Sequence, residues 1–187
     1  MSILHPGSLY EVIHKTYDIQ RNYMFKVLFP DRSDLITYLV SNTATPVEVT
    51  ETRNIPWLSS EIKIGGTTRY DNWTVNVKEN DRGDIYKYFS KWKKIIYNKT
   101  EDKGLGTSGL PIEYKKAIYL DLLSTAGEIV QHYIMRGAFP VNIGATTLDY
   151  NNEGFAVIPV TFALDDFVWQ EGGKPEPGKA FSPSFGL

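Results

Sequence analysis

The chain has 187 residues, enough for one domain with a hydrophobic core, and its 42% hydrophobic residues exclude a fully disordered chain. The formal net charge of −2 argues against a dedicated nucleic-acid-binding domain, and the absence of cysteine excludes disulfides, thiolate metal sites and a cysteine nucleophile. Since no apolar run approaches the ~20 residues that cross a bilayer and the first residues do not resemble a secretory signal, we expect a soluble, metal-independent protein made in the cytoplasm.

Three segments of different character divide the chain. Residues 1–20 have no clean periodicity, and we expect an N-terminal arm that is ordered only by contact with another molecule. Residues 21–169 carry regular apolar patterns and predict one β domain. Residues 170–187 are rich in glycine and proline and predict a mobile C-terminal tail.

The first part of the domain predicts short strands separated by turns. Residues 23–29 predict an apolar strand, and residues 35–40 a second strand that a short polar turn joins to it as a hairpin. Further along, residues 56–60 break the strand pattern, and the glycine pair at 65–66 predicts a turn into the next strand.

Between these segments, residues 47–53 predict an unusually polar strand. Glu48, Thr50 and Thr52 share one of its faces, because side chains alternate along a strand. A strand this polar is solvated on at least one side, as on the wall of an open surface or channel.

The central part of the chain predicts a strand at residues 73–78 and an amphipathic helix at residues 84–97. Asp81 or Asp84 is expected to cap the first turn of this helix. The apolar stripe of the helix recurs at three- and four-residue spacing and needs a sheet to cover it. The stripe consists of Ile85, Tyr88, Phe89, Trp92, Ile95 and Ile96.

A polar, glycine-rich loop follows the helix, and the remaining domain predicts further strands. These are expected at residues 117–123, 128–136, 147–150 and 155–167, with a fixed turn at 139–144. Pro159 lies inside the last strand and implies an edge position or a bulge there, because proline donates no ladder hydrogen bond. The sequence therefore predicts about eight strands and one helix in a mainly β domain.

No group of residues predicts catalysis, metal binding or cofactor binding. His5, His14 and His132 are scattered and lack neighbouring carboxylates at ligand spacing, so we expect each to be structural or solvated. Residues 104–109 match the dinucleotide-binding spacing of glycines, but a helix precedes them and Pro111 follows, which favours a flexible loop. The residues give no support to an enzyme.

Lys87, Lys91 and Lys94 recur at four- and three-residue spacing beside the apolar stripe, and we call them the lysine stripe. One interpretation is a solvated helix face. The other is a docking surface for an acidic partner.

Short motifs occur in a fixed order along residues 21–169. They include Ala44-Thr45-Pro46, Tyr70-Asp71-Asn72-Trp73-Thr74-Val75, Glu113-Tyr114-Lys115-Lys116, residues 137–144 and residues 160–165. Each motif is weak alone. As an ordered set around the amphipathic helix, they resemble the tail tube proteins of contractile-tailed bacteriophages, which are related to the inner tubes of contractile injection systems.

This resemblance implies a β-sandwich or barrel-like domain with one flanking helix. It also implies a virion subunit, assembled in the host bacterial cytoplasm, of which six copies form a ring around a channel. Stacked rings would form a tube inside a sheath protein, above baseplate proteins, and conduct DNA without specific binding. Two alternatives remain open: a tube-initiating baseplate protein of the same fold, and an inner-tube subunit of a phage-derived contractile injection system.

Three surfaces are candidates for these roles. The polar set of Glu48, Thr50 and Thr52, together with Thr161 and Asp165, is expected to face the channel. A near-neutral or acidic wall suits sliding DNA, because lysines on the wall would hold the phosphates electrostatically. Residues 57–69, represented by Trp57, Leu58 and Arg69, interrupt the strands and are expected at the contact between successive rings. The lysine stripe is expected to face the sheath.

Overall fold

A computed structural model of the chain describes residues 20–30, 34–99, 106–148, 150–151 and 153–172. The strands are β1 (Phe25–Leu28), β2 (Val40–Thr43), β3 (Glu48–Trp57), β4 (Ser60–Tyr70), β5 (Trp73–Lys78), β6 (Tyr97–Lys99), β7 (Gly106–Ser108), β8 (Lys116–Leu123), β9 (Ile129–Ile143), β10 (Val157–Ala163) and β11 (Asp166–Glu171). The helices are α2 (Asp34–Leu39), α3 (Asp84–Ile96) and α4 (Pro111–Tyr114). The prediction of a mainly β fold is confirmed. The predicted arm lies almost entirely outside the described residues, and β11 extends two residues into the predicted tail.

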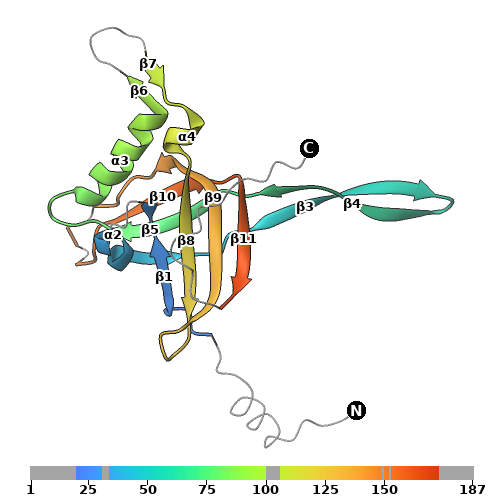
Figure 1. Cartoon of the computed structure of the whole chain (residues 1–187), viewed down its shortest axis with the longest axis horizontal. Coiled ribbons are helices and arrows are strands. Elements are labelled where there is room, and N and C mark those ends of the chain that lie inside the picture. The colour runs from blue at the N-terminus through green and yellow to red at the C-terminus, as the bar shows by residue number, and fades with distance from the viewer. Residues whose placement is uncertain (1–19, 31–33, 100–105, 149, 152, 173–187) are drawn as a thin grey trace, which may run out of the picture.

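One antiparallel sheet holds the body together in the order β1-β8-β9-β10-β5-β2, with β11 also paired to β9 (Figure 1). The long strand β9 belongs to both halves of this sheet: its first part pairs with β8 and β11, and its last part pairs with β10. Gly137 lies where the partners change and has a φ of 62°, and a Cβ there would come within 2.1 Å of the Asp165 carboxylate. A glycine is therefore needed at this bend.

The core fills the space between the inner face of the sheet and α3. Alternate residues of β5 and β10 are buried, and Ile85, Phe89 and Trp92 of α3 are buried against them. Phe162 is at the centre, with ring centroids 5.8–5.9 Å from four other rings. This aromatic core consists of Phe29, Trp73, Phe89, Trp92 and Phe162. The predicted helix and its apolar stripe are confirmed, although Ile95 at the end of the stripe is 40% exposed.

Two N-terminal predictions are wrong. Residues 34–39 form helix α2 instead of a strand, and β1 pairs with β8 instead of forming a hairpin with its neighbour in sequence. Ile36 is buried, Leu39 packs against the core and Tyr38 is exposed. This short pattern fits a helix as well as a strand, so periodicity alone could not decide between them.

The C-terminal strands also differ from the prediction. The expected turn at 139–144 lies within β9, except for Gly144, which follows the end of this strand. The described residues of the expected strand 147–150 form no strand. The expected strand 155–167 is divided into β10 and β11. Pro159 is paired to Asn76 of β5 on one side, whereas on the other side the pairing to β9 ends at Val160. It therefore occupies a local edge, as its missing donor requires.

Candidate assembly surfaces

The most extended surface of the molecule is the hairpin of β3 and β4, which projects from the body (Figure 1). It continues two strands of the main sheet, because β2 leads into β3 and β4 leads into β5. The Asp71 amide donates to the Val47 carbonyl at 3.1 Å and closes the base. None of the residues in β3 or β4 is buried. The hairpin therefore has no hydrophobic core of its own.

The structure corrects the prediction that residues 57–69 interrupt the strands. Pairing is continuous to Trp57 and Ser60, so the predicted break at 56–60 is the tip of the hairpin. The glycine pair 65–66 lies within β4, at a shift of register opposite Thr50 and Thr52. A Cβ on Gly66 would lie 2.9 Å from the Glu51 carbonyl oxygen, so glycine allows the close approach that this bulge requires.

One face of the hairpin is polar. Glu48, Thr50 and Thr52 share this face with Asn54, as the alternation predicted. The hydroxyls of Thr50 and Thr68 lie 3.0 Å apart across the two strands. Nearer the tip, Asn54 Nδ2 donates to Glu61 Oε2 at 3.0 Å.

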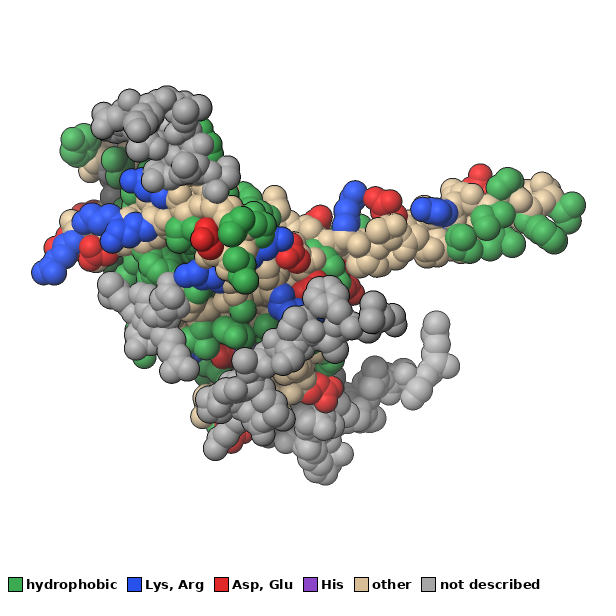
Figure 2. Space-filling view, turned by 45° about the horizontal axis from the view of Figure 1, so that its top comes forward, with side chains coloured by type: hydrophobic (Ala, Val, Ile, Leu, Met, Phe, Trp, Pro, Cys, Tyr) green, Lys and Arg blue, Asp and Glu red, His purple; other side chains and the backbone are tan. Residues whose placement is uncertain are grey.

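The opposite face of the hairpin is apolar toward the tip. Ile55 pairs with Ile62 across the strands, and Trp57 and Ile64 flank this pair. Their exposed fractions lie between 43% and 62%. Figure 2 shows hydrophobic side chains gathered at the far end of the projection. We call these four residues the apolar face.

Leu58 forms the tip and has a φ of 53°, in the left-handed region. This conformation costs a non-glycine residue about 1–2 kcal/mol, and glycine is the usual residue at such a turn position. The leucine side chain is 97% exposed. Neither backbone geometry nor packing against the described part of the chain therefore explains a leucine at this position.

Arg69 does not lie with Trp57 and Leu58. It is paired opposite Val49 near the base of the hairpin, and its guanidinium forms a 3.0 Å ion pair with Glu51. Because both side chains are more than half exposed, this pair contributes little to stability. Of the three predicted inter-ring residues, the structure brings only Trp57 and Leu58 together.

Thr161 lies on the outward face of β10, in a patch of threonines and asparagines. Its hydroxyl is 3.1 Å from that of Thr74, and Asn76 Nδ2 donates to Asn42 Oδ1 at 2.6 Å. Thr43 Oγ1 donates to the Thr74 carbonyl at 2.9 Å. Thr43 is paired with buried Val75 and belongs to the inner face, so we call the other four residues, Thr161, Thr74, Asn76 and Asn42, the neutral patch. Of these residues, the sequence alone predicts only Thr161 as a surface candidate. The others come together with it only through the pairing of β2, β5 and β10.

Asp165 follows β10 and accepts hydrogen bonds from Lys115 Nζ at 2.7 and 2.8 Å. The five predicted channel residues are thus in three places: three on the polar face of the hairpin, Thr161 in the neutral patch, and Asp165 in an ion pair. No hydrogen bond or ion pair within the described part of the chain joins these places.

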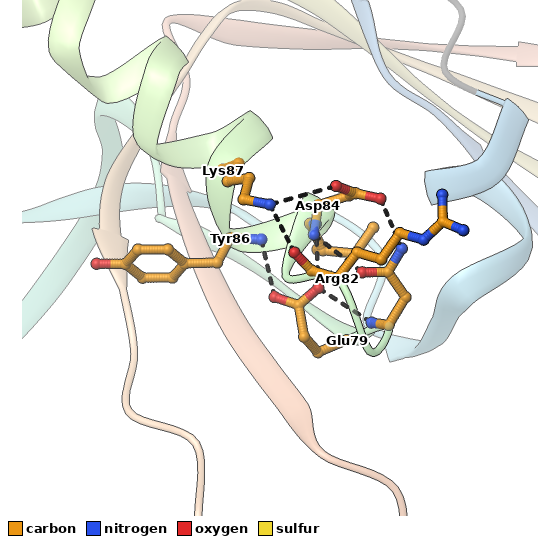
Figure 3. Close-up of polar contacts among 7 residues, drawn as sticks. Glu79, Arg82, Asp84, Tyr86 and Lys87 are labelled. Carbon is orange, nitrogen blue, oxygen red and sulfur yellow. Dashed lines mark hydrogen bonds and ion pairs between the residues drawn. The ribbon is translucent and has the colours of Figure 1, made fainter.

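The lysine stripe lies along one exposed side of α3. Lys87 is partly engaged within the chain, because its Nζ donates to the Arg82 carbonyl at 2.6 Å and lies 3.7 Å from the Asp84 carboxylate (Figure 3). Lys91 and Lys94 have exposed side chains and no ion pair among the residues described. These two lysines are the more accessible part of the stripe.

The first turn of α3 is capped by Glu79 and Asn80, which the sequence alone does not single out. Glu79 Oε1 and Oε2 accept from the Ile85 and Tyr86 amides at 3.0 and 2.9 Å (Figure 3). Asn80 Oδ1 accepts from the Asp84 amide at 2.9 Å, and Asn80 Nδ2 donates back to the Asp84 carboxylate. The expectation that Asp81 or Asp84 supplies the cap is wrong. The hydrogen bond from Asn80, with Lys87 and Arg82 nearby, lowers the pKa of Asp84 below its ordinary 3.8.

Two hydrogen-bonded side-chain pairs lie on the outward face of the sheet. His132 Nδ1 is hydrogen-bonded to the Asp121 carboxylate, both side chains are buried, and the Tyr119 ring stacks on the imidazole. Arg136 forms a bidentate pair with Asp166, which raises the pKa of Arg136. Asp121 is eleven residues before His132, and only the register of β8 against β9 brings them together. The sequence reading therefore missed this carboxylate.

The described residues contain no helix that is long and apolar enough to span a bilayer, and no cluster of three or more His, Asp or Glu residues that could hold a metal. The geometry instead offers surfaces for association: an apolar hairpin tip, a neutral patch and a basic helix face.

A family model described as T4-like virus tail tube protein gp19 matches residues 21–168. The tail tube protein gp19 of Enterobacteria phage T4 is 28% identical over 150 residues, which cover 79% of this chain and 90% of the relative. The tail tube protein of Serratia phage KSP90 is 23% identical and covers 70% and 77% of the two chains.

Solved structures show the same fold. The tube-terminating cap of the anti-feeding prophage aligns with a TM-score of 0.62 at 17% identity, over 83% of this chain and 93% of the other. A chain of the sheath–tube complex of an extracellular contractile injection system aligns with a TM-score of 0.58 at 17% identity, over 87% and 97%.

Proposed function

This chain belongs to the family of T4-like virus tail tube proteins, and we propose on that basis that six copies form a ring, that rings stack into a tail tube, and that the central channel conducts DNA into the host. The partners in this proposal are further copies of the chain, the tail sheath and the baseplate. DNA passes through the channel without specific binding.

The observation that carries the proposal is the projecting hairpin. Its apolar face and Leu58 have no partner surface within the described part of the chain, although apolar side chains of this size gain about 1.5–3 kcal/mol each on full burial. A contact with another copy in the next ring would bury them. A two-stranded hairpin is marginal in water by itself, so such a contact would also order it.

The channel wall is assigned to the polar face of the hairpin at Glu48, Thr50 and Thr52, together with Thr161 and Asp165. The carboxylate of Glu48 and the hydroxyls of Thr50 and Thr52 suit a wall along which DNA slides, because these groups offer no positive charge to the phosphates. Lys63 shares this face of the hairpin opposite Asn54, nearer the tip, and is outside the assigned wall. Lys115 already neutralises Asp165, so Glu48 carries the clearer test. Glu48→Lys should leave tubes intact and impair DNA delivery, and normal infectivity of the variant would refute this assignment.

The sheath-facing side is assigned to the lysine stripe, where Lys91 and Lys94 are the accessible members. An acidic sheath surface would complement them. A variant with Lys87, Lys91 and Lys94 all changed to glutamate should still form tubes but fail to recruit sheath. Normal sheathed tails from this variant would exclude the assignment.

Electron microscopy of the purified protein over a concentration series tests the proposal directly. Long hollow tubes are expected, and Trp57→Ser should reduce them to rings or single chains. Ile112→Ser is the matched control, because Ile112 is an exposed apolar residue on α4, away from the hairpin, and is 86% exposed against 62% for Trp57. Isolated rings that extend only on added baseplate would favour the tube-initiating alternative. An absence of rings and tubes under every condition, baseplate included, would overturn the proposal.

A further inference from the structure

A second apolar surface lies beside the neutral patch, on the loop between β9 and β10. Leu148 and Phe155 are 84% and 76% exposed, and Tyr150 is fully exposed. They line a hollow of about 1010 Å³, whose floor includes Asn76 and Pro159. We call this surface the loop hollow.

The next feature of the loop hollow is the charge of its described lining. None of the described residues that line it carries a charge. Lys78 lies beside this surface: its Nζ is 4.7 Å from the centre of the Phe155 ring, in a cation–π contact. An apolar segment could therefore enter without burying an unpaired charge, which would be unfavourable.

The loop hollow and the hairpin tip lie at opposite ends of the molecule. Only two residues separate the end of β4 from Trp73, where β5 begins, whereas Phe155 contacts Lys78, where β5 ends. In Figure 1 the hairpin extends away from the body on the side opposite to the direction of β5. At about 3.3 Å per residue, β5 and the hairpin together separate Leu58 from the loop hollow by roughly 50 Å. One chain therefore cannot place its own tip in its own hollow.

We propose that the loop hollow receives the hairpin tip of a second copy of this chain, with Leu58 and Trp57 packed against Leu148, Tyr150 and Phe155. This assignment rests on the proposed function and names the receiving surface for the contact between rings. Two different patches at opposite ends form a heterologous contact, which repeats from copy to copy instead of closing a dimer.

The chemistry of the two surfaces is complementary. The tip brings one aromatic and one aliphatic side chain, and the receiving loop has two aromatic rings and one aliphatic side chain that are otherwise exposed to water. Aromatic residues at the centre of a contact usually dominate its stability. The contact would also supply the reason for a leucine in left-handed conformation at the tip.

Cysteine cross-linking tests this assignment cleanly, because the natural chain contains no cysteine. The double variant Leu58→Cys with Leu148→Cys, treated with a short bis-maleimide, should give a ladder of dimers, trimers and longer species. The matched control combines Leu58→Cys with Ile112→Cys, which lies on an exposed apolar site of α4, and should give no ladder. Leu58→Cys alone should remain monomeric on a denaturing gel, because a heterologous contact does not bring two tips together.

The outcomes separate this assignment from the proposed function. Tubes with a ladder only in the Leu148 pair support both. Tubes in which the Leu148 pair gives no ladder, or in which the Ile112 pair cross-links equally well, overturn the loop hollow as the receiving surface and leave the tube proposal standing. If the chain without cysteine substitutions forms neither rings nor tubes, even with baseplate added, and the Leu148 pair gives no ladder, both are overturned.

Discussion

The body and the hairpin of this molecule are built on opposite principles. In the body, five aromatic rings surround one another between α3 and the sheet, and Phe89 and Phe162 are fully buried. In the hairpin, nine residues of β3 pair with nine of β4, and no residue of either strand is buried. Both regions contain large apolar residues. What differs is that those of the body are packed against each other, whereas those of the hairpin have no partner surface within the described part of the chain.

The difference predicts how each region responds to mutation. Changes in the body should alter the free energy of unfolding of one chain. Changes on the apolar face of the hairpin should leave that quantity almost unaltered and act on association. The variants below test this separation, from the largest expected effect on unfolding to the smallest.

Phe162→Ala should have the largest effect on stability. It removes the central ring of the aromatic core and leaves a cavity, which costs about 3–5 kcal/mol for a buried phenylalanine. Urea denaturation of the monomer measures this loss. Tyr38→Ala is the control, because Tyr38 is 82% exposed and should change the unfolding free energy by less than about 0.5 kcal/mol. A loss below about 1 kcal/mol for Phe162→Ala would show that the core is looser than the ring distances indicate.

The sequence predicted those parts of the fold that depend on local pattern. The strand at 73–78 and the helix with its apolar stripe from Ile85 to Trp92 are confirmed. Each segment is long enough to repeat a single hydrophobic period several times, so its pattern fits only one kind of element. The short segment 34–39 fits both a helical and a strand period, and proline and glycine at 139–144 predict a turn. Pro140 is accommodated within β9 at a bulge opposite β10, which only the tertiary structure reveals.

The candidate surfaces were less predictable because they depend on register. The shared face of Glu48, Thr50 and Thr52 follows from alternation within one strand. The neutral patch and the pair of Asp121 with His132 need the pairing of separate strands, which no single segment encodes. Helical spacing alone predicts that Lys87, Lys91 and Lys94 share one exposed side of α3, whereas the bonds of Lys87 to Arg82 and Asp84 depend on how the first turn is folded.

Glu79→Ala should have a smaller effect, because it removes a helix cap without opening a cavity. Two backbone amides of α3 would lose their acceptor, and the expected loss is about 1–2 kcal/mol of unfolding free energy. Asp81→Ala is the matched control in the same connection and should be nearly neutral. If the two variants lost equal stability, the capping role of Glu79 would be wrong.

Leu58→Gly should separate the two regions most sharply, because its two effects have opposite signs. Relief of the left-handed conformation should leave the unfolding free energy unchanged or raise it by up to about 1 kcal/mol. Loss of the exposed side chain should at the same time reduce tube formation. Denaturation and electron microscopy of the same preparation measure both. Normal tubes from this variant would show that the leucine side chain is not needed for the contact between copies.

Asp84→Asn should have the smallest effect, visible only in acid. Asn80 is the main cause of the lowered pKa of Asp84, so the folded chain holds this carboxylate ionised more strongly than the unfolded chain does. Its contribution is therefore complete above the ordinary pKa of 3.8 and is lost as the pH falls through the lower pKa of the folded state. Between about pH 5 and pH 2, the melting temperature of the natural chain should fall more steeply than that of Asp84→Asn. Asn80→Ala should make the melting temperature depend less steeply on pH in the same way, whereas Trp57→Ser in the hairpin should leave the slope of this pH profile unchanged. A parallel fall in all three variants would show that the acid response comes from elsewhere in the body and that the first turn of α3 adds nothing to it.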